Sequence, residues 1–421
     1  MNLVKSKISF LINNKEAKAL AANFIWLSIL KIVGYIFPLI TLPYLARVIG
    51  VDSFGEIAFA TSIMIFIETF VDFGFNYTAT RDIARHRCDL DMVSKIFSNV
   101  MWAKTLLMLI GFGILCLLIY TIPTLYEKRL LLFLTFLYVP GHIIFPDWFF
   151  QAMEKMKYIT IINVLSKLLF AVLVFIVIKE KSDYIWQPLL TAAGYWVGGA
   201  FAMFLIIKKF NVRIRRPIFI EIMRVIKNSG NMFLSLLFPN LYTNFSTILL
   251  RTTCGEVATG LFDAGNRFVS IVDQLFQVLS RTFYPFLARK INHHNLYVKI
   301  SGILSILMSI ALFISADILV QICYTSEFSA AGDVIRIMSI SPFSLFLINT
   351  FGVNYLVLVG NEKQYRNIVF IYSIIGFLVT WILTTKYSYI GTAITISGIW
   401  LLRGLTTFYY ARRHKVLTNK E

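Results

Sequence analysis

The sequence predicts an all-α integral membrane protein of about twelve transmembrane helices, arranged in two six-helix lobes around a central cavity. The composition is 58% hydrophobic, with a mean hydropathy of +0.73, whereas a soluble globular domain is closer to half apolar. Runs of about 20 apolar residues, long enough to cross the hydrocarbon core, recur along the whole chain. Lys and Arg gather in alternate connections between these runs, which is the pattern of a multi-pass protein.

The apolar runs follow one another at about 35 residues for a span plus its loop. Residues 159–178 read ITIINVLSKLLFAVLVFIVI, and residues 367–385 read NIVFIYSIIGFLVTWILTT. Segments of this kind are centred near residues 33, 66, 109, 139, 168, 197, 241, 270, 308, 346, 376 and 400. We therefore expect an N-terminal lobe over 1–207, a cytoplasmic basic linker over 208–229 and a C-terminal lobe over 230–421, with no room for a soluble domain.

The basic residues predict the orientation of the chain. With a cytoplasmic N-terminus, Lys and Arg in the cytoplasmic segments outnumber those in the opposite loops by roughly three to one. This bias places both termini in the cytoplasm. It also accounts for most of the net charge of +18, through topology and contact with anionic membrane lipids, so no nucleic-acid partner is expected.

A weak internal repeat relates the two halves. The segment RVIGVDSFGEIAFA (47–60) aligns with RTTCGEVATGLFDAG (251–265) when one residue is inserted. The alignment matches Arg47 with Arg251, Gly50 with Gly255 and Gly55 with Gly260. Two parallel halves of this kind suit alternating access to a site near the midplane. Within the first segment, Asp52 and Glu56 are interpreted as solvated caps at an external loop.

The span at 257–283, VATGLFDAGNRFVSIVDQLFQVLSRTF, carries a polar stripe. At about 100° per residue its polar side chains share one side of the helix. They are Asp263, Arg267, Ser270, Gln274, Gln277 and Arg281. Because a charge at the bilayer centre costs at least about 2.5 kcal/mol, we expect the stripe to face a cavity. The alternative for Arg267 is an ion pair with Asp263. Asp273 is a further coupling or ion-pair candidate.

Three other spans carry polar groups. Asn240, Asn244 and Arg251 share one side of the seventh span, and Lys31 lies in the first. In the second span, Glu68 and Asp72 are one turn apart and repel each other. One of them would be partly protonated unless a cation or base lies near, which suggests a coupling-ion or proton site. The alternative is that both pair with Lys31, Arg81 or Lys104.

These residues together suggest an anionic, sugar-containing substrate. The substrate-binding candidates are Arg267, Lys31, Arg251, Gln274, Gln277, Asn240 and Asn244. Arg and Lys suit phosphate or carboxylate groups, and the amides suit hydroxyl-rich sugars. No HExxH, CxxC, Walker or GxSxG motif is present, so we expect a transporter with no catalytic residue, metal or cofactor. Coupling to a proton or sodium gradient stays open, as does pairing between Cys254 and Cys323, although unpaired thiols are favoured.

Four segments resemble one family across nearly the whole chain. LPYLARVIGVDSFGEIAFA (42–60), PDWFFQAMEKMKYI (146–159), YPFLAR (284–289) and SEFSAAGDVIRIMSISP (326–342) are similar to landmarks of the O-antigen type of polysaccharide-repeat flippase. This family lies in the multidrug/oligosaccharidyl-lipid/polysaccharide exporter superfamily. Ala152 departs from the Gly that many relatives have there.

The resemblance implies movement of an undecaprenyl-diphosphate-linked oligosaccharide to the periplasmic leaflet of the bacterial inner membrane. It also implies a place beside a polysaccharide polymerase and chain-length proteins in O-antigen or lipopolysaccharide biosynthesis. A drug/cation antiporter shares the fold but should have a net negative cavity. A membrane glycan polymerase should have large external loops or an acidic metal motif.

Overall fold

The computed structural model describes residues 15–289 and 294–418, and this part of the chain folds into helices without a strand. In the first half the helices are α2 (Lys15–Asp72), α3 (Phe75–Arg85), α4 (Leu90–Thr121), α5 (Pro123–Glu127), α6 (Arg129–Phe136), α7 (Tyr138–Ile143), α8 (Asp147–Ala152), α9 (Met156–Val177), η1 (Lys181–Trp186) and α10 (Gln187–Lys208). The second half holds α11 (Phe219–Arg289), α12 (His294–Cys323), η3 (Ser326–Phe328), α13 (Ala331–Met338), α14 (Ser341–Leu347), the π-helix η4 (Ile348–Val357) and α15 (Glu362–Thr418).

The helical and apolar character confirms the predicted fold class. Eight stretches of the described chain, or nine if one bent pair counts as a span, are long and apolar enough to cross a membrane. Three of the long helices, α2, α11 and α15, contain a break in the helical backbone. The total of twelve crossings and the cytoplasmic termini stay predictions.

The chain divides into two compact units. The first comprises residues 1–41, 67–179 and 185–233, and the second comprises 42–66, 180–184 and 234–421. The helix α2 therefore contributes to both units, with its middle part in the second. The lobe boundaries expected from the sequence stay a prediction.

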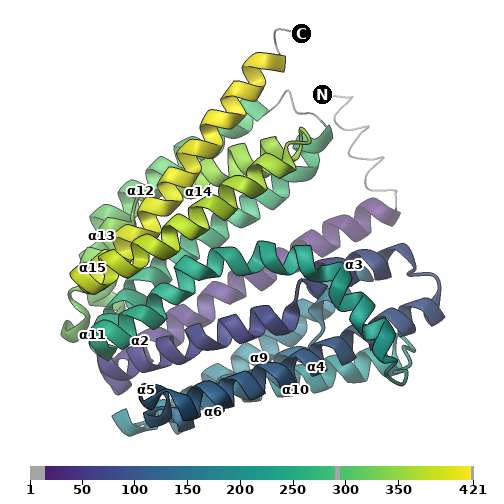
Figure 1. The fold of residues 1–421 in the computed structure, drawn as a ribbon, viewed down its shortest axis with the longest axis horizontal. Coiled ribbons are helices and arrows are strands. Elements are labelled where there is room, and N and C mark those ends of the chain that lie inside the picture. The colour runs from purple at the N-terminus through teal and green to yellow at the C-terminus, as the bar shows by residue number, and fades with distance from the viewer. Residues whose placement is uncertain (1–14, 290–293, 419–421) are drawn as a thin grey trace. The chain divides into compact units, whose positions relative to one another are not determined.

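Aromatic packing builds the core of the first unit. Trp148, Phe149 and Phe150 of α8 are almost fully buried, and Phe97 of α4 contacts the first two with ring centroids 5.6 and 5.5 Å apart. Aromatic contacts of this kind add to the free energy of apolar burial. Helix α9 packs along α10 (Figure 1). Helix α10 also packs along α7. The segment PDWFFQ (146–151), the start of the sequence segment 146–159 given above, thus contributes its aromatic side chains to the core.

The second unit is built around α11, α13 and α15. Phe262 and Val269 of α11 pack with Val334 of α13 and Ala393 of α15 in one buried cluster. Helix α14 runs beside α15 in Figure 1, and the two are in extensive contact. This packing buries one face of α11 and leaves its other face to carry polar side chains.

Gly50 and Gly255, the first pair of glycines that the internal repeat aligns, break their helices in the same way. Gly50 has φ 74° and ψ 174°, and Gly255 has φ 91° and ψ 179°. This backbone region is essentially restricted to glycine. The shared conformation agrees with the repeat proposed from the sequence.

A second aligned pair, Gly55 and Gly260, forms a close helix crossing in the second unit. A Cβ atom at Gly55 would collide with the backbone of Glu256, and one at Gly260 would collide with the backbone of Val51. Small residues let helix backbones approach closely in membranes. This crossing brings the segment after Gly50 against the segment after Gly255.

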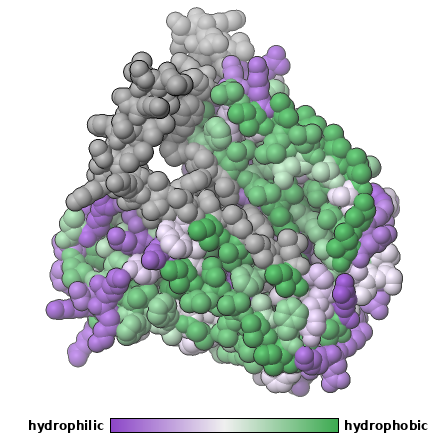
Figure 2. Space-filling model, turned by 180° about the vertical axis from the view of Figure 1, so that it is seen from behind, coloured by the Kyte–Doolittle hydropathy of each residue, from purple (hydrophilic) through white to green (hydrophobic). Residues whose placement is uncertain are grey.

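Apolar side chains cover much of the coloured surface in Figure 2, and hydrophilic residues gather toward its margins. Large hydrophobic residues on α4, α9 and α12 are exposed, among them Leu117, Ile176 and Ile314. A soluble monomer rarely exposes apolar patches of this extent. The surface is that of a multi-pass membrane protein.

Candidate functional site

The polar stripe of α11 lies on the incompletely buried face of the second unit. Its members Asp263, Arg267, Ser270, Gln274 and Gln277 are all partly exposed, whereas apolar side chains of the same helix, such as Phe268, Val269 and Phe276, are buried. The helix therefore has the two-faced character predicted from its sequence. The side chain of Arg281, the last residue of the predicted stripe, lies outside the described part of the structure.

Arg267 is held by a carboxylate and an aromatic ring. Its Nε donates to Oδ2 of Asp263 at 2.7 Å, and its guanidinium lies 4.7 Å from the ring centroid of Phe54. Phe54 is itself packed edge-on against Tyr324 at 6.1 Å. The ion pair proposed as the alternative for Arg267 is thus present. The Arg267 side chain is nevertheless 36% exposed.

Arg251 pairs with Glu56, and this contact corrects the interpretation of Glu56 as a solvated cap. Glu56 is only 3% exposed, and its Oε1 accepts from Nε of Arg251 at 3.0 Å and also from Nη2. The reason is the Gly55–Gly260 crossing, which brings the two helices into contact and buries the carboxylate. Asp52, in contrast, is half-buried and pairs with Lys181 at 2.8 Å.

One amide of the stripe, Gln277, and the amides of the seventh span hydrogen-bond along their own helix. Nε2 of Gln277 donates to Asp273 at 2.9 Å, and Nδ2 of Asn244 donates to Oδ1 of Asn240 at 2.9 Å. Such contacts fix the side-chain directions without consuming every donor and acceptor. Lys31 belongs to α2, but its side chain lies outside the described part of the structure.

The two carboxylates of the second span lie in a buried ion cluster of the first unit. Nζ of Lys104, a residue of α4 that is only 2% exposed, donates to Asp72 at 2.8 Å and to Asn76 at 3.1 Å. Asn76 in turn donates to the second oxygen of Asp72 at 3.0 Å. Among the partners weighed for Glu68 and Asp72 in the sequence, Lys104 is therefore the one observed for Asp72.

His142 of α7 completes this ion cluster and was missed by sequence reasoning. Its Nε2 lies 3.4 Å from Oε1 of Glu68 and 3.5 Å from Oδ2 of Asp72. The only signal in the sequence is an ionisable residue inside an apolar span, which by itself suggests function. Glu68, Asp72 and His142 offer ligand atoms within 4.8 Å of one another, but Lys104 already neutralises Asp72 and opposes a divalent cation there.

Arg403 is a second residue whose surroundings the sequence did not predict. Its position near the end of the last span suggests an interfacial anchor. In the structure its Nη2 donates to the Tyr365 hydroxyl at 3.1 Å, and Tyr242 interacts with the same guanidinium. The described cysteines, including Cys254 and Cys323, are free thiols.

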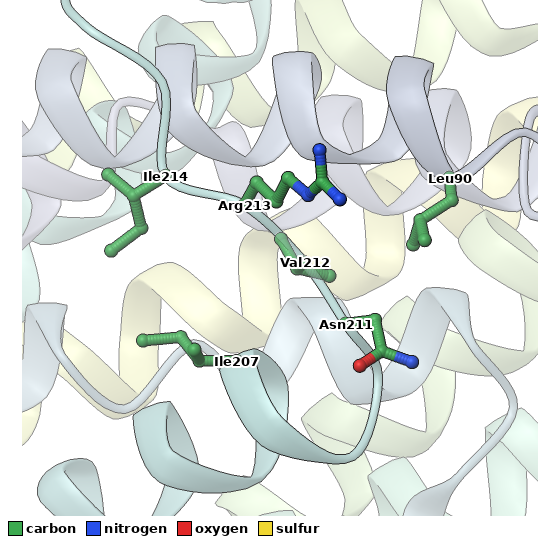
Figure 3. Close-up of a pocket in the computed structure, with 6 residues that line it drawn as sticks. All are labelled: Leu90, Ile207, Asn211, Val212, Arg213 and Ile214. Atoms are coloured by element: carbon green, nitrogen blue, oxygen red, sulfur yellow. The ribbon is translucent and has the colours of Figure 1, made fainter.

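A cavity of about 500 Å³ lies where the linker leaves α10. Figure 3 shows the residues that line it, with Leu90 from α4, Ile207 from α10 and the remainder from the extended segment, Asn211, Val212, Arg213 and Ile214. Ser94 and Ser98 of α4 accept hydrogen bonds from the linker backbone at 3.1 and 2.8 Å. The linker is therefore held against α4, and the cavity is a mostly apolar surface feature.

Comparison with known proteins identifies the family. The model of the polysaccharide biosynthesis protein family matches residues 20–290, more than half of the chain. The chain belongs to this family. A protein of Escherichia coli (strain K12) with the provisional name O-antigen transporter is 28% identical over 419 residues, which is 96% of this chain and 99% of that protein. A protein of Shigella dysenteriae with the same provisional name is 24% identical over 383 residues, 89% of this chain and 95% of that protein.

Solved structures share the fold of this family member. The lipid II flippase MurJ in an inward closed conformation has a TM-score of 0.74 at 13% identity, covering 93% of this chain and 87% of MurJ. An inward-facing multidrug resistance transporter of the MATE family, in the MOP superfamily, has a TM-score of 0.68 at 15% identity. The match covers 94% of this chain and 99% of that transporter. The transporter names of these relatives agree with the prediction of a transporter rather than an enzyme.

Proposed function

We propose that this chain moves an undecaprenyl-diphosphate-linked oligosaccharide repeat unit from the cytoplasmic to the periplasmic leaflet by alternating access. The observation that carries the proposal is its similarity, over nearly the full length of both chains, to a protein provisionally named O-antigen transporter. The membership in a polysaccharide biosynthesis family supports it. The location would be the bacterial inner membrane, where such lipid-linked units are made and consumed.

The polar stripe of α11 would serve the substrate head group. Arg267 would donate to the diphosphate or to an acidic sugar, with Lys31 and Arg251 as further cations. Gln274, Gln277, Asn240 and Asn244 would bind sugar hydroxyl groups. The lipid tail would remain in the bilayer, so that only the head group needs a polar path.

The ion pairs of Arg267 and Arg251 limit what each arginine can contribute to the free energy of substrate binding. Asp263 accepts from Arg267 at 2.7 Å, so a phosphate adds to an existing pair rather than meeting an unpaired cation. A hydrogen bond to a charged group contributes about 1.5–3 kcal/mol. Arg267, which is partly exposed, is the better candidate than Arg251, whose partner Glu56 is buried. No cofactor is proposed, and polymerase and chain-length proteins would be functional partners.

Deletion of the gene provides the test. The proposal predicts that a lipid-linked oligosaccharide accumulates and that surface polysaccharide falls, with both effects reversed by the wild-type gene. If surface polysaccharide is unchanged and the cells instead become sensitive to cationic drugs, a drug/cation antiporter is supported and the flippase proposal is wrong. If an unpolymerised repeat unit accumulates on the periplasmic side, a polymerase is supported instead.

A further inference from the structure

The ion cluster of Glu68, Asp72, Lys104 and His142 has no role in binding the substrate as proposed above. Its charged side chains come from α4, α7 and the part of α2 that belongs to the first unit. Burial of ionisable groups inside a membrane protein is costly, and these groups are kept where they serve a function. The polar stripe, by comparison, belongs to the second unit.

The surroundings of His142 contain more acid than base. Its Nε2 faces Glu68 and Asp72 of α2 at 3.4 and 3.5 Å, and Lys104 of α4 bonds to the same Asp72. The other titratable groups around it are Tyr138 of α7, Asp147 of α8 and Tyr195 of α10. Tyr138 is also hydrogen-bonded to Glu68.

The charge balance of this group depends on His142. With a neutral imidazole, three carboxylates, those of Glu68, Asp72 and Asp147, face Lys104, the cation that the described residues place among them. A proton on His142 adds a second cation between Glu68 and Asp72. Uncompensated buried charge is strongly unfavourable, so the geometry favours uptake of one proton at this imidazole. Its Nδ1 is buried without a hydrogen-bond partner in the described chain.

A proton suits the site better than a metal ion. Lys104 lies 2.8 Å from Asp72 and occupies one of the two carboxylate oxygens, and Asn76 donates to the other. A sodium ion prefers an all-oxygen shell, which the imidazole nitrogen does not provide. A histidine changes its charge in the physiological pH range without any such shell.

The helix α2 connects this cluster to the other unit. Residues 42–66 belong to the second unit, and Glu68 and Asp72 follow directly after the chain enters the first. Two of the three acids, Glu68 and Asp72, are therefore on α2, while Lys104 and His142 are on α4 and α7. A displacement of α2 relative to α7 would change the distance between acid and base, and with it the affinity of His142 for a proton.

We propose that this cluster is a proton-binding site that drives the transport cycle, with His142 as the proton carrier and α2 as the link to the second unit. Nε2 of His142 takes a proton from water at the periplasmic side and releases it to water at the cytoplasmic side, while Glu68 and Asp72 remain ionised. The role in transport rests on the proposed function, whereas proton binding does not.

The transport arm of the test uses cells that lack the chromosomal gene and carry a plasmid copy. The rate at which surface polysaccharide appears after induction is measured at external pH values of about 6 and about 9, a range wide enough to include the charge change of a histidine beside carboxylates. We expect the wild type to be faster at the lower pH, and His142→Gln to be slow and independent of pH at an equal protein level. His86→Gln is the matched control, because His86 is exposed in the loop between α3 and α4.

The binding arm uses purified protein in lipid nanodiscs with isotope-labelled histidine. The chain has five histidines, and the ring signal of His142 is the one absent from His142→Gln. We expect this signal to titrate with pH and its titration to change in Glu68→Gln, which retains the imidazole. Glu68→Gln also keeps the proposal testable if His142→Gln does not accumulate.

The outcomes separate the two proposals. If the wild type does not restore surface polysaccharide, the proposed function fails, and the nuclear magnetic resonance titration still decides whether His142 binds a proton. If the wild type restores it and His142→Gln shows the same rates and pH profile, the coupling proposal is overturned while the proposed function stands. A His142 signal that does not move with pH also overturns the proposal.

Discussion

Replacing Arg251 should reveal whether this residue stabilises the protein or binds the substrate. Its partner Glu56 is 3% exposed, so Arg251→Ala leaves a buried carboxylate without its cation. Breaking a buried pair in this way costs about 3–5 kcal/mol, compared with about 0–1 kcal/mol for a surface pair. Because the Arg251 side chain is 21% exposed, we expect the lower end, about 3 kcal/mol, which is a factor of more than about 100 in the folding equilibrium.

A double-mutant cycle in purified protein measures this cost. The free energy of unfolding in detergent is compared for wild type, Arg251→Ala, Glu56→Gln and the double variant. The structure predicts a large loss for Arg251→Ala, a smaller loss for Glu56→Gln, and recovery of much of the loss in the double variant, since no buried charge then remains unpaired. Wild-type stability of Arg251→Ala would refute the stabilising role of this ion pair, and lost export at that stability would leave substrate binding as the role of Arg251.

Three further predictions concern the close helix crossing and the stripe. Gly55→Ala should lower the level of folded protein because the added Cβ atom collides with the backbone of the crossing helix, whereas a Cβ atom at Gly113 has no other atom within 4 Å, so Gly113→Ala should leave the level unchanged. Equal levels of the two variants would contradict the close helix crossing. Ser270→Cys should react with a small hydrophilic thiol reagent and Val269→Cys, at 0% exposure, should not; equal labelling would remove the evidence for a water-accessible stripe. Arg267→Ala should lower export about tenfold to a hundredfold at unchanged protein level, and unchanged export would exclude it from the substrate site.

Local periodicity explains why the stripe could be predicted from the sequence. Asp263 and Arg267 are one turn apart on the same helix, so their alignment follows from about 100° per residue. The segment 146–159 carries part of the family resemblance, and the structure shows that its aromatic residues Trp148, Phe149 and Phe150 pack in the core of the first unit. The helical periodicity of polar residues and the length of an apolar run are local properties, so each can be read from a single segment of the sequence.

Contacts between distant segments could not be predicted in the same way. His142 reaches Glu68 and Asp72 only because α7 packs against helices that lie far from it in the sequence. The sequence predicts Glu56 to be a solvated loop residue, whereas the close approach of the helices at Gly55 and Gly260 buries it against Arg251. Such pairs depend on the packing of whole helices, and a single sequence contains no direct signal for them.

The leaflet in which the lipid-linked oligosaccharide accumulates tests the central claim most directly. Spheroplasts of the deletion strain, with and without the wild-type gene, are treated with a membrane-impermeant periodate reagent that oxidises only sugars exposed at the outer face. The account predicts that the oligosaccharide of the deletion strain is protected and that the wild-type gene makes it accessible. An oligosaccharide that is equally accessible in both strains would contradict the assignment of this chain as the flippase.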